Sequence, residues 1–310
     1  MTQAPFHRDL TPDAPEEGRA AWLTTADGFR LRAMVWPVDG ARGTVFILHG
    51  RSEYIEKYAP LAAELARAGL ASLTIDWRGQ GLSDRHPRKP MMGHVTGFSD
   101  YQHDLKALAD HAESLGLPKP WYLFSHSMGG AIALRALLSG FPVQSAVFSA
   151  PMWGIAFAPG LKPVAWALSH AAAPLRADHR FVPTTGATTY IATATFAGNS
   201  LTRHEPSFEL MRTQVQSRPE LALGGPSMAW LRAALRECRA LTRSQPPDIP
   251  ALTALGHAER VVDPRPVHAV MRRWQKGQLM MVPEAQHELV MERDHIRRAF
   301  LDAMLDRFTR

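Results

Sequence analysis

A serine between small residues joins a strand-like segment to a helix-like segment. Ser127 lies in the run Ser-His-Ser-Met-Gly-Gly (residues 125–130), after an apolar stretch and before a segment rich in Ala and Leu. This context is typical of a nucleophile elbow, a sharp strand-to-helix turn that projects a serine at the edge of a sheet. Residues two before and two after the serine must be small because strand and helix nearly touch there. Ser127 is therefore the candidate nucleophile, with Ser125 at the position where the motif usually has Gly.

A histidine near the end of the chain has the position that a general base requires. His287 follows the last strand-like segment, in the loop sequence Pro-Glu-Ala-Gln-His-Glu. A hydrolase triad in the chain order serine, acid, histidine needs its base there. The chain has 14 histidines, so position and not residue type selects this one. We expect its neutral imidazole to take the Ser127 proton and return it to the leaving group.

The triad acid has two candidates in the segment Gly-His-Ala-Glu-Arg-Val-Val-Asp-Pro (residues 256–264). Glu259 lies three residues beyond the glycine that ends a strand-like segment, which is where a triad acid is expected. Asp263 has the commoner residue type but lies four residues later. We favour Glu259 because a triad is defined by geometry, and Asp263 stays as the alternative.

The turn after residues 44–48 could complete an oxyanion hole. The backbone N–H groups of Arg51 and Met128 are the expected donors, Met128 being the residue after the nucleophile. The Arg51 side chain would be free to meet a phosphate or carbonyl of the substrate, or to pair with a surface acid. Glu53 is expected to organise this loop rather than to catalyse.

Other polar residues are expected to be structural. Asp76 and Arg78 lie in a glycine-rich turn and can hydrogen-bond neighbouring loops together. His94, His103 and His126 have no second ligand at metal spacing in the sequence. We therefore expect no metal and no cofactor.

The elements that must position these residues alternate between strand-like and helix-like. Strand-like segments are residues 21–25, 29–36, 44–48, 70–75, 121–124, 145–149, 251–255 and 278–282. Helix-like segments are residues 55–68, 99–115 (with Ser99 as N-cap), 128–138, about 267–275 and about 293–308. Repeated β–α alternation predicts an α/β fold with a mostly parallel central sheet and helices on both faces.

The alternation stops for about a hundred residues after the segment 145–149. This stretch is rich in aromatic residues and follows the carboxyl end of a strand, where ligands bind in open α/β sheets. We expect residues 152–236 to form a cap, or lid, inserted into a core made of residues 1–151 and 237–310. The alternative is an ordinary helical elaboration far from the site.

Composition narrows the class of protein further. The chain has 310 residues, a net charge of +6 and one cysteine, Cys238, which excludes an internal disulfide framework. The basic residues are scattered, so we expect no nucleic-acid partner, although a weak preference for anionic membrane surfaces stays open. No apolar stretch is long enough to span a bilayer, and the polar start has no secretory signal. We expect a cytoplasmic protein, in contact with the inner membrane face at most peripherally.

The chain resembles bacterial lysophospholipases of the α/β-hydrolase superfamily and their relatives, the monoacylglycerol lipases. The resemblance lies in the elbow and in the segments at residues 49–58, 76–85, 97–105 and 256–264, and two segments within 201–231 resemble the family's cap. It implies a serine esterase that releases a fatty acid from a lysophospholipid or monoacylglycerol, with Ser127 and His287 at matching positions. The chain departs from the pattern at Ser125, and at Glu259, where monoacylglycerol lipases have Asp.

Several other functions remain as alternatives to the hypothesis of a lipid esterase. A short-chain carboxylesterase or thioesterase would use the same residues, and an acyltransferase would need a site dry enough for an alcohol to outcompete water. A non-catalytic small-molecule receptor on the same fold has no need for an activated nucleophile. Dehalogenases and epoxide hydrolases are disfavoured because they use an Asp nucleophile. Oligomeric state, head group and chain length are not readable from the sequence.

Overall fold

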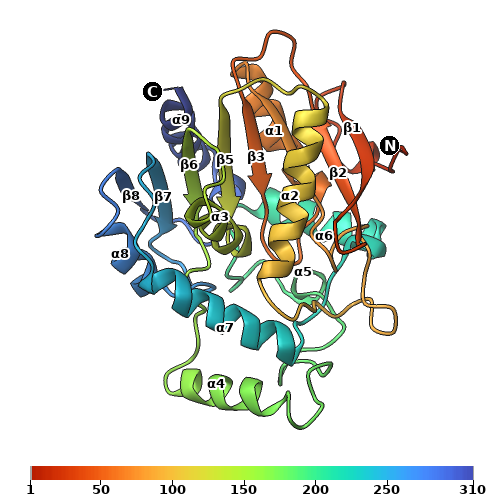
Figure 1. Ribbon diagram of the computed structural model, residues 1–310, viewed down its shortest axis with the longest axis vertical. Coiled ribbons are helices and arrows are strands. Elements are labelled where there is room, and N and C mark those ends of the chain that lie inside the picture. Colours follow the sequence, from red (N-terminus) through yellow and green to blue (C-terminus); the bar gives the residue numbers. More distant parts are fainter. Residues whose placement is uncertain (1, 310) are drawn as a thin grey trace.

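One sheet of eight strands runs through the computed structural model, which describes residues 2–309 (Figure 1). The strands are β1 Arg19–Thr24, β2 Arg30–Trp36, β3 Thr44–Leu48, β4 Ala71–Ile75, β5 Trp121–His126, β6 Ser145–Ser149, β7 Ala251–Gly256 and β8 Gly277–Val282. Their order across the sheet is β1-β2-β4-β3-β5-β6-β7-β8. Strand β2 is antiparallel to both of its neighbours, and all other pairs are parallel. The predicted mostly parallel sheet is confirmed.

The central strands are apolar because both faces of the sheet are covered. Every residue of β3, β4, β5, β6 and β7 is buried, which explains their continuous apolar runs in the sequence. Helices α2 (Ser99–Ser114), α3 (Met128–Leu138) and α8 (Pro264–Met271) pack on one face. Helices α1 (Ala59–Arg67) and α9 (Asp294–Thr309) pack on the other. In Figure 1, α2 and α3 lie in front of the sheet, and α1 and α9 lie behind it.

Three helix boundaries differ from the sequence-based expectation. The expected helix over residues 55–68 is a 3-10 turn, Ile55–Tyr58, followed by α1 with a proline in its first turn. Ser99 lies inside α2 and its side chain does not cap the helix. Helix α8 begins at Pro264, earlier than expected, because the Asp263 carboxylate caps it by accepting the Arg265 N–H at 3.1 Å.

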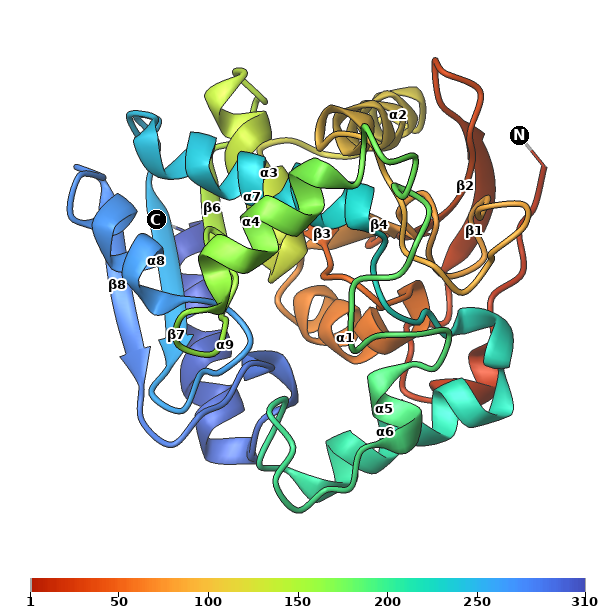
Figure 2. The ribbon, with the colours of Figure 1, turned by 90° about the horizontal axis from the view of Figure 1, so that it is seen from below.

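The segment expected to be a cap lies at one end of the sheet, seen from below in Figure 2. Its elements are α4 Leu161–Ala171, α5 Tyr190–Thr193, α6 Glu205–Ser217, a 3-10 turn Pro219–Leu221 and α7 Met228–Arg243. Helix α7 continues through residue 236, so the expected end of the cap falls inside a helix. Residues of α7 on both sides of that position, Trp230 and Leu241 among them, belong to the main apolar core. Helix α7 therefore connects cap and core.

Helix length and polarity bear on membrane insertion. Within residues 2–309, no helix is both long enough and apolar enough to cross a bilayer.

Candidate active site

Ser127 occupies a strained turn between β5 and α3. Its backbone has φ 50° and ψ −118°, a conformation that costs a residue with a side chain about 1–3 kcal/mol. Hydrogen bonds on both sides hold the turn: Ser127 N–H donates to the Ser149 carbonyl at 3.1 Å, and Met152 N–H donates to the Ser127 carbonyl at 2.8 Å. This is the geometry of a nucleophile elbow.

Small residues around the turn are required by close packing. A Cβ on Gly129 would lie 1.9 Å from the Leu48 carbonyl oxygen, and one on Gly130 would lie 2.5 Å from Pro151 Cβ. Ser125 is fully buried, and its hydroxyl donates to the Val147 carbonyl of the neighbouring strand at 3.4 Å. Ser125 can therefore replace the glycine that is usual at this position, because its buried hydroxyl still has a hydrogen-bond acceptor.

The structure brings Glu259 to His287. His287 Nδ1 lies 2.8 Å from Glu259 Oε2, and both side chains are buried. The other carboxylate oxygen accepts the N–H groups of Val261 at 2.6 Å and Val262 at 3.1 Å. Burial opposes the charge, but His287 and these hydrogen bonds prevail and lower the pKa of Glu259. A carboxylate held in this way can fix the imidazole with Nδ1 protonated and Nε2 free.

Asp263, the alternative acid, lies elsewhere. Its carboxylate is engaged by the backbone and guanidinium of Arg265, at 2.8 to 3.1 Å. Gly256 explains why Glu259 reaches His287 instead. A Cβ at Gly256 would lie 2.3 Å from the Ala285 carbonyl, so only glycine lets the two loops approach this closely. Position relative to that glycine was the sequence signal that favoured Glu259.

The cap segment holds the loop that carries His287. Gln286 Nε2 donates to the Asn199 carbonyl at 2.9 Å, and Glu288 N–H donates to the Leu201 carbonyl at 2.8 Å. Thr202 Oγ1 donates to the Met291 carbonyl at 2.8 Å. The position of the candidate base thus depends on contacts with residues 199–202 of the cap.

The turn after β3 lies directly against the nucleophile. A Cβ on Gly50 would be 3.1 Å from Ser127 Cβ. Within residues 2–309, neither Arg51 N–H nor Met128 N–H donates to a protein acceptor. Two free N–H groups beside a serine have the character of an oxyanion hole.

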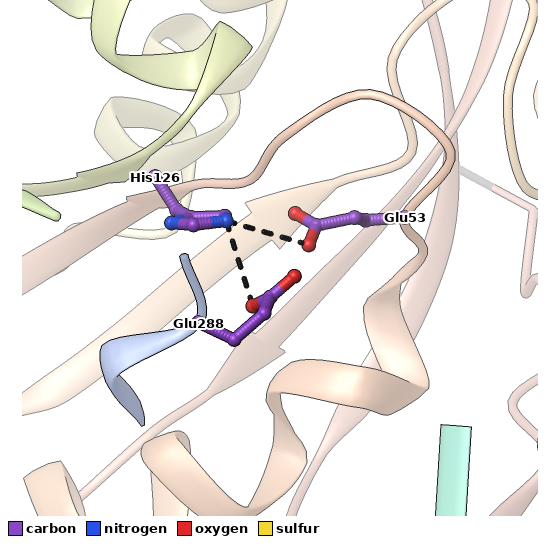
Figure 3. A group of neighbouring side chains, drawn as sticks. All are labelled: Glu53, His126 and Glu288. Carbon is purple, nitrogen blue, oxygen red and sulfur yellow. Dashed lines mark ion pairs between the residues drawn. The ribbon is translucent and has the colours of Figure 1, made fainter. Parts of the chain in front are cut away.

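A buried charged cluster lies beneath this turn (Figure 3). The Lys57 ammonium donates to Glu288 Oε1 at 2.7 Å and also to Glu53 Oε1. Glu53 Oε2 accepts the Gly50 N–H and the Tyr58 hydroxyl. His126 Nε2 lies 3.5 Å from Glu288 Oε2 and 3.9 Å from Glu53 Oε1. Glu53 therefore organises the loop, as the sequence led us to expect.

The surroundings of His126 favour its charged, doubly protonated form. Its Nδ1 faces the Ser149 carbonyl at 3.1 Å and its Nε2 faces the carboxylates, so both nitrogens need a proton. Burial opposes this charge, but Glu288 and Glu53 overcome it and raise the pKa of His126. With His126 protonated, two cations balance two carboxylates. Its ring centroid lies 4.6 Å from that of His287.

Sequence reasoning missed this cluster: His126 has no second ligand at metal spacing along the chain, but the fold brings two carboxylates to it from distant positions. Ligand atoms of Glu53, His126 and Glu288 lie within 4.8 Å of one another, a spacing that could hold a metal ion. However, the Lys57 ammonium already binds both carboxylates and supplies the positive charge. Two signals were present: Lys57 follows Glu53 at helical spacing, and Glu288 follows His287 directly.

The turn after β4 is structural, as expected. Asp76 Oδ2 accepts from Arg32 Nε at 2.7 Å, and Asp76 Oδ1 accepts from Ile55 N–H at 2.9 Å. Arg78 binds Asp104 and Asp27. These ion pairs, all buried except that with the half-exposed Asp27, connect the loops that surround the site.

An open cavity of about 440 Å³ lies between the sheet and the segment 152–236, and most of the candidate residues line it. Ser127, His287, Arg51 and Met128 line it on the core side. Many of the other lining residues are apolar and belong to the cap and its flanks: Met152, Ile155, Phe157, Val182, Ile191, Leu201, Met211, Val215 and Leu231. Within residues 2–309 the Ser127 hydroxyl has no hydrogen-bond partner, so Ser127 or His287 must adjust when substrate binds.

Comparison with known proteins agrees with this architecture. Residues 39–294 match the family model Hydrolase_4, described as serine aminopeptidase, S33. The chain is 32% identical to lysophospholipase L2 of Escherichia coli over 303 residues, covering 94% of this chain and 87% of that protein. It is 30% identical to the monoglyceride lipase of Saccharomyces cerevisiae over 118 residues, 37% of each chain.

Solved structures show the same fold. A soluble variant of the Saccharomyces cerevisiae monoglyceride lipase, in complex with a substrate analog, aligns with a TM-score of 0.74 and 21% identity. It covers 99% of this chain and 98% of that one. The monoacylglycerol lipase of Paleococcus ferrophilus aligns with a TM-score of 0.67 and 18% identity, covering 89% and 99%. The predicted α/β-hydrolase fold is confirmed.

Proposed function

Because the chain belongs to the Hydrolase_4 family of the α/β-hydrolase superfamily, and is a serine hydrolase, we propose that it releases a fatty acid from a single-chain glycerolipid. The substrate class is a lysophospholipid or a monoacylglycerol, which the names of its relatives suggest. The observation that carries the proposal is the single cavity that has Ser127 and His287 on one side and apolar cap residues on the other. An acyl chain fits such a lining, with its ester at the polar side.

Acylation begins at Ser127. As its oxygen attacks the acyl carbonyl carbon, His287 Nε2 takes the hydroxyl proton, and Glu259 stabilises the resulting imidazolium. The oxyanion accepts the N–H groups of Arg51 and Met128. When the tetrahedral intermediate collapses, the ester C–O bond breaks and His287 returns the proton to the departing glycerol oxygen. The product of this half-reaction is an acyl-Ser127 ester.

Deacylation repeats these steps with water. His287 takes a proton from the water, whose oxygen attacks the acyl carbonyl. Collapse of the second tetrahedral intermediate releases the fatty acid and returns the proton to Ser127. A short-chain ester or a thioester would pass through the same steps, so only the size of the cavity and its apolar residues favour a long acyl chain.

The description of the family as aminopeptidases does not suit this cavity. An aminopeptidase needs a carboxylate to hold the substrate's α-ammonium group. The carboxylates that line the cavity, Glu53 and Glu288, are both bound to Lys57. An ester substrate without a positive charge at that point is the better match.

The test is fatty-acid release from a long-chain monoacylglycerol, a lysophosphatidylcholine and a short soluble ester. Wild type is compared with Ser127→Ala, and with Ser139→Ala, an exposed serine just beyond the end of α3, as the matched control. We expect release from the lipids to fall by at least about 10³-fold in Ser127→Ala only. Release from the short ester alone, or from none of the three, would contradict the proposal.

We further propose that the cap touches lipid surfaces. Helix α4 and the turn after it expose large apolar side chains: Leu161, Val164, Leu168 and Leu175, the last 74% exposed. Lys162 and Arg176 lie in the same segment. Apolar and basic groups together favour an anionic bilayer surface. The double substitution Leu168→Ser and Leu175→Ser should weaken sedimentation with phosphatidylglycerol vesicles; unchanged sedimentation would exclude this surface.

A further inference from the structure

The side chain of Arg51 lines the cavity beside the proposed oxyanion hole and has no acidic partner. Within residues 2–309 no carboxylate forms an ion pair with it, and its guanidinium makes one hydrogen bond, from Nη1 to the Gly224 carbonyl of the cap at 2.8 Å. Of the five N–H bonds of a guanidinium, at most two sit on that nitrogen. The donors on Nε and Nη2 are therefore free.

The guanidinium is nevertheless held firmly in place. Its carbon lies 5.6 Å from the centroid of the Trp230 ring, a cation–π distance, and Trp230 is itself fixed by a hydrogen bond to the Tyr101 hydroxyl at 3.1 Å. On another side, a Cβ at Gly93 would come within 3.2 Å of Nη1. Burial without an acidic neighbour lowers the pKa of Arg51 to about 10, so the group stays charged at neutral pH.

A second arginine shows what a purely structural role looks like in this region. Arg85 also binds the cap turn at residues 220–224, donating to the Ala222 and Glu220 carbonyls, each at 2.7 Å. Its remaining donors bind the carbonyls of Gly81 and Pro90, at 2.7 to 3.0 Å. Arg85 does not line the cavity. Two arginines thus hold one cap turn, but only Arg51 keeps free donors and faces the substrate.

We propose that Arg51 is a specificity-determining residue whose guanidinium binds the phosphodiester of a lysophospholipid head group. This inference rests on the proposed function and selects lysophospholipids within its substrate class. Arginine pairs with phosphate through two parallel N–H donors, and a partly buried guanidinium without a counterion lacks a partner that this anion would supply.

The reach of the side chain fits that assignment. Arg51 N–H is a proposed oxyanion donor, so the Arg51 backbone lies beside the acyl carbonyl. Five bonds separate its Cα from the guanidinium carbon, and six separate the carbonyl carbon of a 1-acyl lysophospholipid from phosphorus, each about 1.5 Å long. One residue can therefore contact the reacting carbonyl through its backbone and the head group through its side chain. A monoacylglycerol presents only a neutral hydroxyl there.

The test measures binding and turnover separately. Binding is measured in Ser127→Ala protein, which leaves the ligands intact, by titration with a lysophosphatidylcholine and with the monoacylglycerol of the same acyl chain. Adding Arg51→Met should weaken lysophosphatidylcholine binding about tenfold to a hundredfold relative to the monoacylglycerol. Arg51→Lys should recover part of this loss, because its ammonium group supplies the positive charge but not the two parallel N–H donors. Arg85→Met, the matched control, should leave the ratio of the two dissociation constants unchanged.

With Ser127 present, the ratio of kcat/KM for the two lipids should shift by the same factor, chiefly through KM. If Arg51→Met weakened the binding of both ligands equally, the inference would be overturned. The side chain would then only hold the cap through its hydrogen bond to Gly224. Arg51-dependent binding of millimolar inorganic phosphate, with lysophosphatidylcholine binding unchanged by Arg51→Met, would also overturn it and indicate a site for free phosphate. Absence of turnover by wild type, with the binding ratio still dependent on Arg51, would contradict the proposed function alone.

Discussion

The core side of the cavity and the cap side are built in different ways. On the core side, Lys57 and His126 lie buried against the carboxylates of Glu53 and Glu288, and strained Ser127 is held by neighbouring strands. On the cap side, the ion pair between Arg232 and Asp178 is partly exposed, and large apolar side chains face outward. The difference teaches that the candidate catalytic residues are held by buried, interlocking contacts, whereas the cap side of the cavity is held by fewer and more exposed ones.

The largest expected effect concerns the candidate acid on the core side. Glu259→Gln should lower kcat by about 10³- to 10⁴-fold, because an amide no longer fixes the His287 tautomer or stabilises its imidazolium. Asp263→Asn is the matched control and should change kcat less than about threefold, since Asn also caps helices well. Turnover of both variants is measured on one lipid at one pH. A greater loss in Asp263→Asn would transfer the role of acid to Asp263.

The next effect contrasts the stability of the two regions. Glu288→Gln leaves Lys57 and His126 with a single carboxylate, and should reduce the free energy of unfolding by about 3–5 kcal/mol. In the cap, Asp178→Asn weakens a partly exposed pair with Arg232 and should cost less than about 1 kcal/mol. Urea unfolding of both variants gives the comparison.

The same experiment has an internal check on charge balance. Adding Lys57→Met to Glu288→Gln removes the excess cation and should recover part of the lost stability. Equal losses in Glu288→Gln and Asp178→Asn would remove the distinction between a balanced buried cluster and an exposed pair.

The smallest expected effect is a dependence on pH of the stability of the junction between cap and core. His86 Nε2 lies 3.2 Å from His179 Nδ1, and the His94 ring stacks on that of His179 with centroids 4.4 Å apart. Lys89 binds the His179 carbonyl, and the charges of Asp178 and Asp100 act on His94 in the opposite direction. Burial and the neighbouring imidazoles lower the pKa of His94 to about 4, and that of His86 also falls.

The direction in which the stability of this junction changes with pH follows from the lowered pKa of His94. The packed junction binds fewer protons than the opened one, so its stability is present above pH 6.5 and is lost as pH falls toward about 4. Tryptic cleavage at the exposed cap residue Arg180 should therefore speed up about tenfold between pH 7 and pH 5, after correction for trypsin's own pH profile. His94→Asn should reduce this acceleration, and His170→Gln, a cap histidine outside the junction, should not. A wild-type cleavage rate that does not change with pH would contradict the predicted loss of stability at low pH.

The sheet was predictable because local sequence carries its signal. Buried parallel strands require continuous apolar runs, and residues 44–48 and 145–149 agree with β3 and β6 to the residue. The elbow at Ser127 was readable for the same reason, since its constraint acts within a few residues. Ser99 shows the limit: a suitable residue type near a helix start did not become a cap.

What the sequence did not reveal depends on partners far apart in the chain. Lys57 and Glu288 are separated by 231 positions, so no periodicity connects them. The surroundings of Arg51 were equally hidden, because Gly224 and Trp230 approach it only when the cap folds over the core. The sequence left two partners open for this side chain, a group of the substrate or a surface acid. In the structure its hydrogen bond goes to the Gly224 carbonyl and not to an acid.

The hydrogen bonds from residues 199–202 to the His287 loop have a consequence for redesign. Exchanging the cap with that of a relative is a natural way to transplant substrate preference onto this scaffold. However, the cap carbonyls of Asn199 and Leu201 are also acceptors for the loop that bears the candidate base. A chimera that imports a foreign segment at 199–202 should lose turnover on every ester alike, whereas one joined outside this stretch should change only which esters it accepts.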